Sequence, residues 1–160
     1  AKELGLVVGT GNWRIGAEGL GGEGGTTGRF MAELRQRVFG MRGVTVTGRG
    51  GVATADPLPQ SAFRLGGLKT VRGFDYGTYQ GQAFWSMQGD WTPLKGKVRP
   101  VLFVDVGQAG TVGGVFSQQP LVGAGAGVSF FNGIVRFDVS VPLAGPTTGL
   151  RFDIQFGAPR

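Results

Sequence analysis

Alternation of apolar and polar residues along short segments is the feature that most constrains the fold of this sequence. Successive side chains of a β-strand point to opposite faces, so a period of two predicts strands with one apolar and one polar face. The clearest example alternates Val135, Phe137, Val139, Val141 and Leu143 with Arg136, Asp138, Ser140 and Pro142. Charged residues stand within such segments rather than in turns; they are Glu33, Arg35, Arg37, Asp90, Asp105, Arg136, Asp138, Arg151 and Asp153.

Eight segments of this kind predict an antiparallel, all-β chain. Most of them are close to the ~9–11 residues that a tilted membrane-spanning strand needs. Long connections, at about 21–27, 55–81, 109–120 and 144–148, alternate with short ones, as in outer-membrane barrels. The predicted strands are 4–20, 28–39, 44–54, 82–93, 99–108, 121–130, 134–143 and 149–157. The first is the longest, and Thr10-Gly11-Asn12 is a signal that could break it in two.

Two architectures fit this alternation. In a soluble sandwich the apolar faces pack together, whereas in a transmembrane β-barrel they meet lipid and the charges line a wet interior. Trp13, Trp85 and Trp91 fall on the apolar parity, and Trp85 and Trp91 lie near segment ends, as in an interfacial aromatic belt. We therefore predict a single domain, residues 1–160, that forms an eight-stranded transmembrane β-barrel in a bacterial outer membrane, with lipid as a partner.

Composition excludes several classes of function. The 160 residues include neither cysteine nor histidine, so no metal, cofactor or catalysis is expected, and Ser61 and Ser86 have no imidazole to activate them. No uncharged apolar run reaches the ~18 residues of a membrane helix. The net charge is +6, but the basic residues are dispersed singly, so nucleic acid is not expected as a partner.

The connection at about 55–81 carries the most informative motif. Loops beyond ~12–15 residues usually have a function, and this one contains the run from Arg64 to Phe74, RLGGLKTVRGF. The run resembles the external-loop signature of the outer-membrane protein 85 superfamily, the BamA-like assembly barrels and their two-partner secretion relatives. The hallmark of that signature is Val-Arg-Gly-Phe after a Gly-Gly turn. Val71, Arg72, Gly73 and Phe74 match the hallmark, and Gly66 and Gly67 match the turn.

Further segments extend the resemblance. The stretch from Phe103 to Gly107, FVDVG, is similar to the family's inward-facing Phe-x-Asp strand motif, and Asp90 takes the place of an acid on the preceding strand. In this family the loop folds back into the barrel, where these acids hold its arginine. The resemblance thus implies that Arg72 pairs with Asp90 and Asp105. The alternation by itself also places both acids on the interior face.

The end of the chain carries a second family feature. Phe152, Ile154 and Phe156 resemble the alternating aromatic C-terminal signal by which such barrels are recognised for insertion, although four residues follow the last phenylalanine here. The resemblance implies a minimal BamA-like barrel that assembles or translocates outer-membrane proteins, with periplasmic or envelope proteins as partners. Typical members have sixteen strands and periplasmic domains, whereas this sequence corresponds to the last eight strands alone. A structural or scaffold barrel subunit without transport is the alternative.

The long loop limits how eight strands can close. The interior of an eight-stranded barrel is nearly filled by side chains, so either the loop lies over the mouth or two chains join as a homodimer into a sixteen-stranded barrel. An open half-barrel leaves the backbone groups of its edge strands unpaired in lipid and is excluded. The closed eight-stranded barrel is the simpler of the two predictions.

Overall fold

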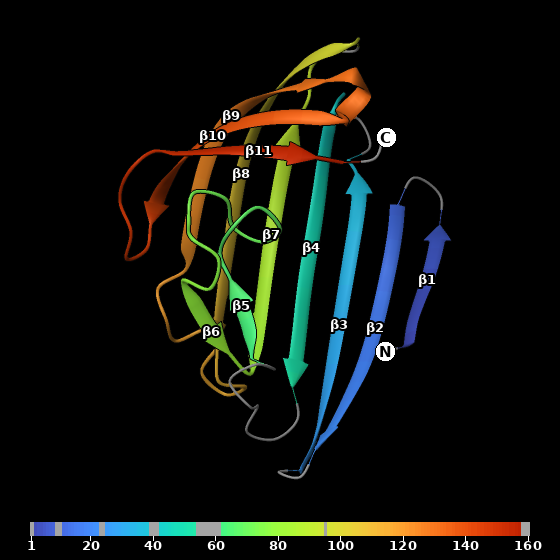
Figure 1. The fold of residues 1–160 in the computed structure, drawn as a ribbon, viewed down its shortest axis with the longest axis vertical. Coiled ribbons are helices and arrows are strands. Elements are labelled where there is room, and N and C mark those ends of the chain that lie inside the picture. Colours follow the sequence, from blue (N-terminus) through green and yellow to red (C-terminus); the bar gives the residue numbers. More distant parts are fainter. Residues whose placement is uncertain are drawn as a thin grey trace.

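The computed structural model describes residues 2–8, 11–22, 25–38, 42–53, 62–94 and 96–157. Within these ranges the chain is an antiparallel, all-β structure (Figure 1). The main sheet has nine strands, and a separate small sheet has two. The one helical element of the described ranges is the short 3-10 turn η1 (Phe131–Gly133). No helix in this part of the chain is long and apolar enough to cross a membrane.

The strands of the main sheet match most of the predicted segments to within a few residues. In the order in which they pair along the sheet, they are β1 (Lys2–Val8), β2 (Gly11–Gly22), β3 (Gly25–Arg37), β4 (Val44–Ala53), β7 (Ala83–Trp91), β8 (Val98–Gly110), β9 (Leu121–Phe130), β10 (Val135–Ala144) and β11 (Arg151–Phe156). The small sheet consists of β5 (Phe63–Leu65) and β6 (Tyr79–Gly81), a hairpin that the sequence did not predict.

Within the described residues the main sheet has nine strands, one more than the eight that the sequence predicts. The segment predicted as one strand, 4–20, contains two, because β1 ends at Val8 and β2 begins at Gly11, where the sequence is rich in turn-forming residues. The connection predicted at 21–27 is shorter than expected, since β2 and β3 stay paired as far as Gly22 and Gly25. Cross-strand pairing there overrides the low strand propensity of glycine.

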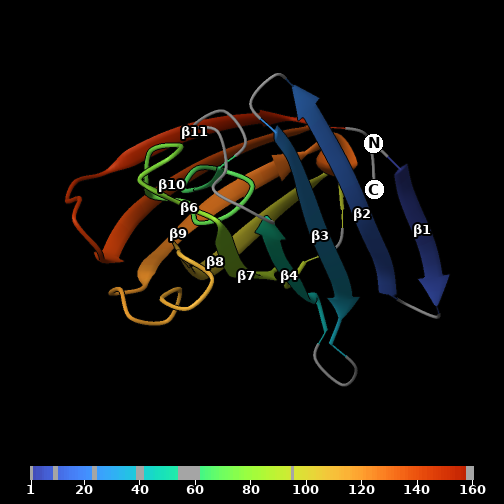
Figure 2. The ribbon, with the colours of Figure 1, turned by 90° about the horizontal axis from the view of Figure 1, so that it is seen from below.

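The main sheet is strongly curved and open (Figure 2). Among the described residues β1 pairs only with β2 and β11 only with β10, so β1 and β11 are its two edges. Closure into a barrel therefore stays a prediction, and so does the sixteen-stranded dimer. Residues 62–82, which we call the loop segment, include the β5–β6 hairpin and lie on the concave side of the sheet (Figures 1 and 2). The preceding part of the predicted loop, 55–61, is outside the described residues.

The two faces of the sheet differ in chemistry as the alternation predicts. On β8, Val104 on the convex face is 54% exposed, whereas its neighbour Asp105 on the concave face is fully buried under the loop segment. Trp85 and Trp91 share the convex parity, while the side chain of Trp13 is outside the described part of the chain. Other exposed apolar residues of the convex face are Phe30, Val52, Met87, Leu102, Val128, Phe137, Val139, Phe152, Ile154 and Phe156.

This exposed apolar face argues against a soluble sandwich. A sandwich would cover it with a second sheet, but within the described residues the one other sheet, β5–β6, is on the charged side. An uncovered apolar face of this extent is expected to meet lipid or another protein.

The buried apolar core lies between the loop segment and the concave face of the sheet. Leu65, Val71 and Phe74 from the loop segment are fully buried. Sheet residues complete this core; the cluster consists of Ala53, Phe63, Leu65, Val71, Phe74, Phe84, Ala109 and Leu121, with Tyr79 packed at its edge. The core therefore holds the loop segment onto the sheet, beside the charged residues of the concave face.

Candidate functional site: an arginine seat on the concave face

The loop segment turns sharply at the predicted Gly-Gly pair. Gly66 and Gly67 have φ angles of +114° and +82°, which favour glycine, and a Cβ at Gly66 would lie 2.0 Å from the carbonyl oxygen of Asp75. The Thr70 hydroxyl receives a hydrogen bond from the Gly66 N–H and donates one to the Gly66 carbonyl, both 2.9 Å. The Gly67 N–H donates to the Phe74 carbonyl at 2.9 Å. The turn thus presents Val71 to Phe74 to the sheet in a fixed conformation.

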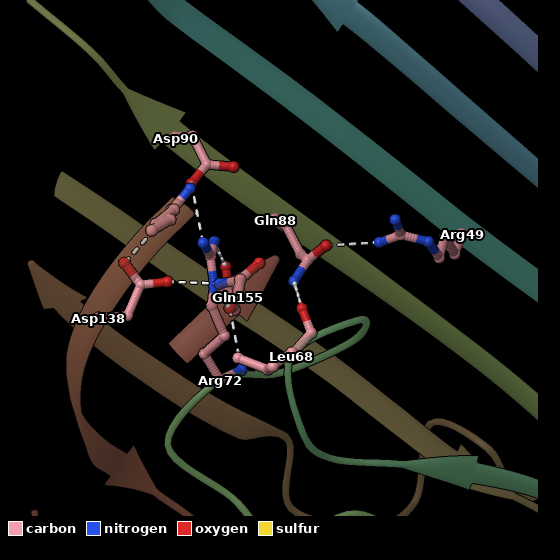
Figure 3. A network of polar contacts seen from close by, with 9 residues as sticks. Arg49, Leu68, Arg72, Gln88, Asp90, Asp138 and Gln155 are labelled. Carbon is pink, nitrogen blue, oxygen red and sulfur yellow. Dashed lines mark hydrogen bonds and ion pairs between the residues drawn. The ribbon is translucent and has the colours of Figure 1, made fainter. Parts of the chain in front are cut away.

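Arg72 is bound by carboxylates of two neighbouring strands. Its Nε and Nη2 donate to the two oxygens of Asp105 on β8, each at 2.6 Å, and its backbone N–H donates to the same carboxylate at 2.9 Å. Its Nη1 donates to Asp90 on β7 at 2.8 Å (Figure 3). A bidentate guanidinium–carboxylate pair fixes both position and orientation of the arginine. The structure therefore brings together the three residues that the resemblance implied as partners.

The surroundings keep this ion pair away from water. Arg72 is 3% exposed and Asp105 is 0% exposed, and the fully buried Val71 and Phe74 flank the arginine in sequence. The Arg72 guanidinium carbon lies 3.8 Å from the ring centre of Phe103, a cation–π contact. Burial lowers the pKa of the Arg72 guanidinium, but the hydrogen bonds and charges of Asp105 and Asp90 outweigh it and hold the pKa above its usual value. Arg72 is therefore cationic at every physiological pH.

The Arg72 pair continues into a longer polar chain. The Asp90 oxygen that accepts from Arg72 also accepts from Arg136 Nη1 on β10 at 3.1 Å. The Nε of Arg136 donates to Asp138 at 2.7 Å, and Gln155 on β11 donates to the other Asp138 oxygen at 2.5 Å (Figure 3). This chain, which we call the β11 chain, links the loop segment to three strands of the sheet, β7, β10 and β11.

A second chain runs from the loop segment in the opposite direction along the sheet. The side-chain amide of Gln88 on β7 donates to the Leu68 carbonyl at 3.1 Å and accepts from Arg49 on β4 (Figure 3). The Nε of Arg49 in turn pairs with Glu33 on β3 at 2.8 Å. The loop segment is thus held by polar contacts on both sides of Arg72.

Glycines on β9 leave space for Arg72 and for the residues that contact it, Asp90, Asp105 and Phe103, which together we call the Arg72 seat. Gly123, Gly125 and Gly127 alternate along the concave face of this strand. A Cβ at Gly123 would lie 1.9 Å from the Arg72 carbonyl oxygen, and one at Gly127 would lie 1.9 Å from the Asp138 carboxylate. A Cβ at Gly125 would lie 2.5 Å from the Phe103 ring. These positions require glycine because another group fills the space that a side chain would take.

The other predicted site residues lie elsewhere or serve different contacts. Gly73 has a φ angle of +94° and packs against the backbone of Val141. Phe152, Ile154 and Phe156 are exposed on the convex face of β11, away from Arg72. Their role in insertion stays a prediction.

Sequence reasoning did not find several members of the site. Gln88, Gln155 and Arg49 are polar residues on the concave parity, but nothing in their local sequence indicates contact with a distant loop. The alternating glycines from Gly123 to Gly127 could have been found, because glycine at every second position predicts a strand face on which another group closely approaches. Among the residues that the structure describes, no group of acids is placed to hold a metal ion. The contacts of Arg72 with Asp90 and Asp105 fix the loop segment on the sheet.

Comparison with known proteins found one protein family whose model matches this chain. The family model for "Haemolysin secretion/activation protein ShlB/FhaC/HecB" matches residues 49–130, just over half of the chain. The matched region runs from β4 to the end of β9 and includes Arg72, Asp90, Asp105 and Gly123. No curated protein matched the chain significantly.

Proposed function

This chain belongs to the ShlB/FhaC/HecB family of haemolysin secretion/activation proteins, and on that premise we propose that it forms part of an outer-membrane β-barrel that secretes a protein substrate. The observation that carries the proposal is the Arg72 seat, because it holds a long loop segment on the charged, concave face of a sheet whose convex face is apolar. A concave polar face is the lining expected of a translocation route.

The loop segment lies on that face and would therefore stand in such a route. Its core residues and Arg72 are buried against β7, β8 and β9, so a polypeptide passing along this face has to pass or displace it. We infer that the ion pairs hold the loop segment in a defined resting position rather than performing chemistry. The proposed function is thus transport controlled by the position of the loop segment.

The open sheet requires further strands in a membrane. Among the residues that the structure describes, the outer edges of β1 and β11 have no strand partner, and lipid cannot satisfy the backbone donors and acceptors there. We propose that additional β-strands, from a second copy of this chain or from another source, complete a closed barrel. The mass of the folded protein in detergent distinguishes a homodimer from a barrel closed otherwise. Partners on the periplasmic side or elsewhere in the envelope would deliver the substrate.

Secretion by cells provides the test. Bacteria that express the protein together with a haemolysin-type substrate should release haemolytic activity into the medium, and Arg72→Ala should abolish most of that release. Arg64→Ala is the matched control, because Arg64 lies in the same loop segment but is exposed on β5. Immunoblots of outer-membrane fractions show whether each variant is inserted. Release by Arg72→Ala at the level of Arg64→Ala would contradict the proposal.

A second candidate is a BamA-like role in assembling outer-membrane proteins. The Val-Arg-Gly-Phe run and the Phe-x-Asp strand support it, since the assembly barrels share both motifs. Proteoliposomes with an unfolded barrel protein as substrate separate the two functions: folding of that protein into the bilayer favours assembly, and release of a haemolysin substrate favours secretion. A structural subunit without transport would support neither reaction.

A further inference from the structure

The last strand of the sheet, β11, is connected to the loop segment through the polar side chains on its concave face. β11 has three concave-facing residues, Arg151, Asp153 and Gln155, and each belongs to a polar chain that ends in the loop segment. Gln155 is the terminal member of the β11 chain described above, which reaches Arg72 through Asp138, Arg136 and Asp90.

Arg151 makes a second, separate connection. Its Nη1 pairs with the carboxylate of Asp75, the residue that follows the Val71–Phe74 motif. Its Nε donates to both oxygens of Asp153 at 3.0 Å, so Asp153 orients the arginine from within the same strand. The Asp75 side chain is 84% exposed and that of Arg151 is 33% exposed, which makes this pair a surface contact rather than part of the core.

Few other contacts hold β11 in the described structure. It has six residues, pairs on one side only with β10, and exposes Phe152, Ile154 and Phe156 on its convex face. Short edge strands with exposed side chains belong to the least stable parts of a fold. The contacts that reach β11 from the concave side therefore come from, or lead to, the loop segment.

We propose that the loop segment positions β11 through these two chains, with Arg151 and Gln155 as positioning residues. Binding of Arg72 by Asp90 and Asp105 then stabilises the position of β11. The outer edge of β11 is thereby held in place for pairing with a further strand. The inference rests on the contacts alone and holds whether or not the barrel secretes protein.

Hydrogen exchange of backbone amides tests the proposal on the protein extracted from the outer membrane in detergent. Arg151→Gln should accelerate exchange in residues 151–156 about two- to fivefold, the range set by loss of a partly exposed ion pair. Arg72→Gln should have at least as large an effect there, although Arg72 makes no direct hydrogen bond to β11 among the contacts of the described residues. Arg64→Gln, in the same loop segment, should leave β11 unchanged.

Exchange in β8 serves as the internal reference, because β8 is a central strand with partners on both sides. If Arg72→Gln unfolds β8 as well, Asp75→Asn replaces it, since that exposed side chain can be changed without disturbing the core. The proposal predicts faster exchange in β11 with β8 unchanged. Unchanged exchange in β11 in both Asp75→Asn and Arg151→Gln would overturn it, whatever the secretion assay shows.

Discussion

At the scale of single residues, Asp105 is expected to contribute more to the free energy of unfolding than any other residue that contacts Arg72. It accepts three hydrogen bonds from Arg72 and is fully buried, so Asp105→Asn leaves a guanidinium in the protein interior without its main counter-charge. Breaking a buried pair in this way costs about 3–5 kcal/mol. Urea unfolding of the detergent-solubilised protein should show a loss of this size.

Asp75→Asn is the control for that measurement. Asp75 also pairs with an arginine, but its side chain is 84% exposed, and exposed ion pairs contribute little to the free energy of unfolding. Equal losses for Asp75→Asn and Asp105→Asn would mean that burial of the Arg72 pair is not what stabilises the loop segment.

Gly123 tests the packing of the seat without changing any charge. The new Cβ of Gly123→Ala would lie 1.9 Å from the backbone oxygen of Arg72, so the loop segment has to shift. Overpacking of this kind costs about 1–3 kcal/mol. Gly48→Ala on β4 is the matched control, since a Cβ there meets no atom within 4 Å. The free energies of unfolding should fall for Gly123→Ala and stay close to wild type for Gly48→Ala; similar values for both would contradict the close approach.

The residues of the seat differ in how far they could be predicted. Arg72, Asp90 and Asp105 were found because a resemblance joined two distant motifs and the alternation placed both acids on one face. The links to Arg136, Gln155 and Gln88 could not be found, because they depend on which strands curve toward the loop segment. That curvature arises from the twist and pairing of the whole sheet rather than from any local pattern.

At the scale of elements, the alternation predicted the strands well wherever one face is charged and the other apolar. It failed in two places where glycine dominates. The segment 4–20 was predicted as one strand, although Thr10-Gly11-Asn12 indicated a possible break. The segment 21–27 was predicted as a loop, because propensity gives no information on which glycines pair across a hairpin. The β5–β6 hairpin was missed because three-residue strands are too short to show a period.

The convex face of β11 gives a prediction that belongs to this scale. If Ile154 faces lipid, Ile154→Arg should destabilise the folded protein in a bilayer by about 2–4 kcal/mol, depending on depth. Ile154→Leu keeps the side chain apolar and should be close to wild type. Folding titrations in phospholipid vesicles measure both. A bilayer stability of Ile154→Arg equal to that of Ile154→Leu would place this face outside the membrane.

At the scale of the whole molecule, three features combine: an open curved sheet, an apolar convex face, and a loop segment seated on the charged concave face. Family membership connects these features with secretion. Every proposed function of Arg72 requires the loop segment to lie inside the curved sheet when the protein is in its membrane.

A cross-linking experiment in intact cells tests that position most directly. The chain has no cysteine, so introduced thiols are unique. Leu68→Cys combined with Gln88→Cys places two thiols where a loop carbonyl and a concave side chain now share a hydrogen bond, and a short bifunctional maleimide should join them. Leu68→Cys combined with Met87→Cys should not react, because Met87 is on the convex face. Absence of the 68–88 cross-link, or equal yields for both pairs, would contradict the seated loop.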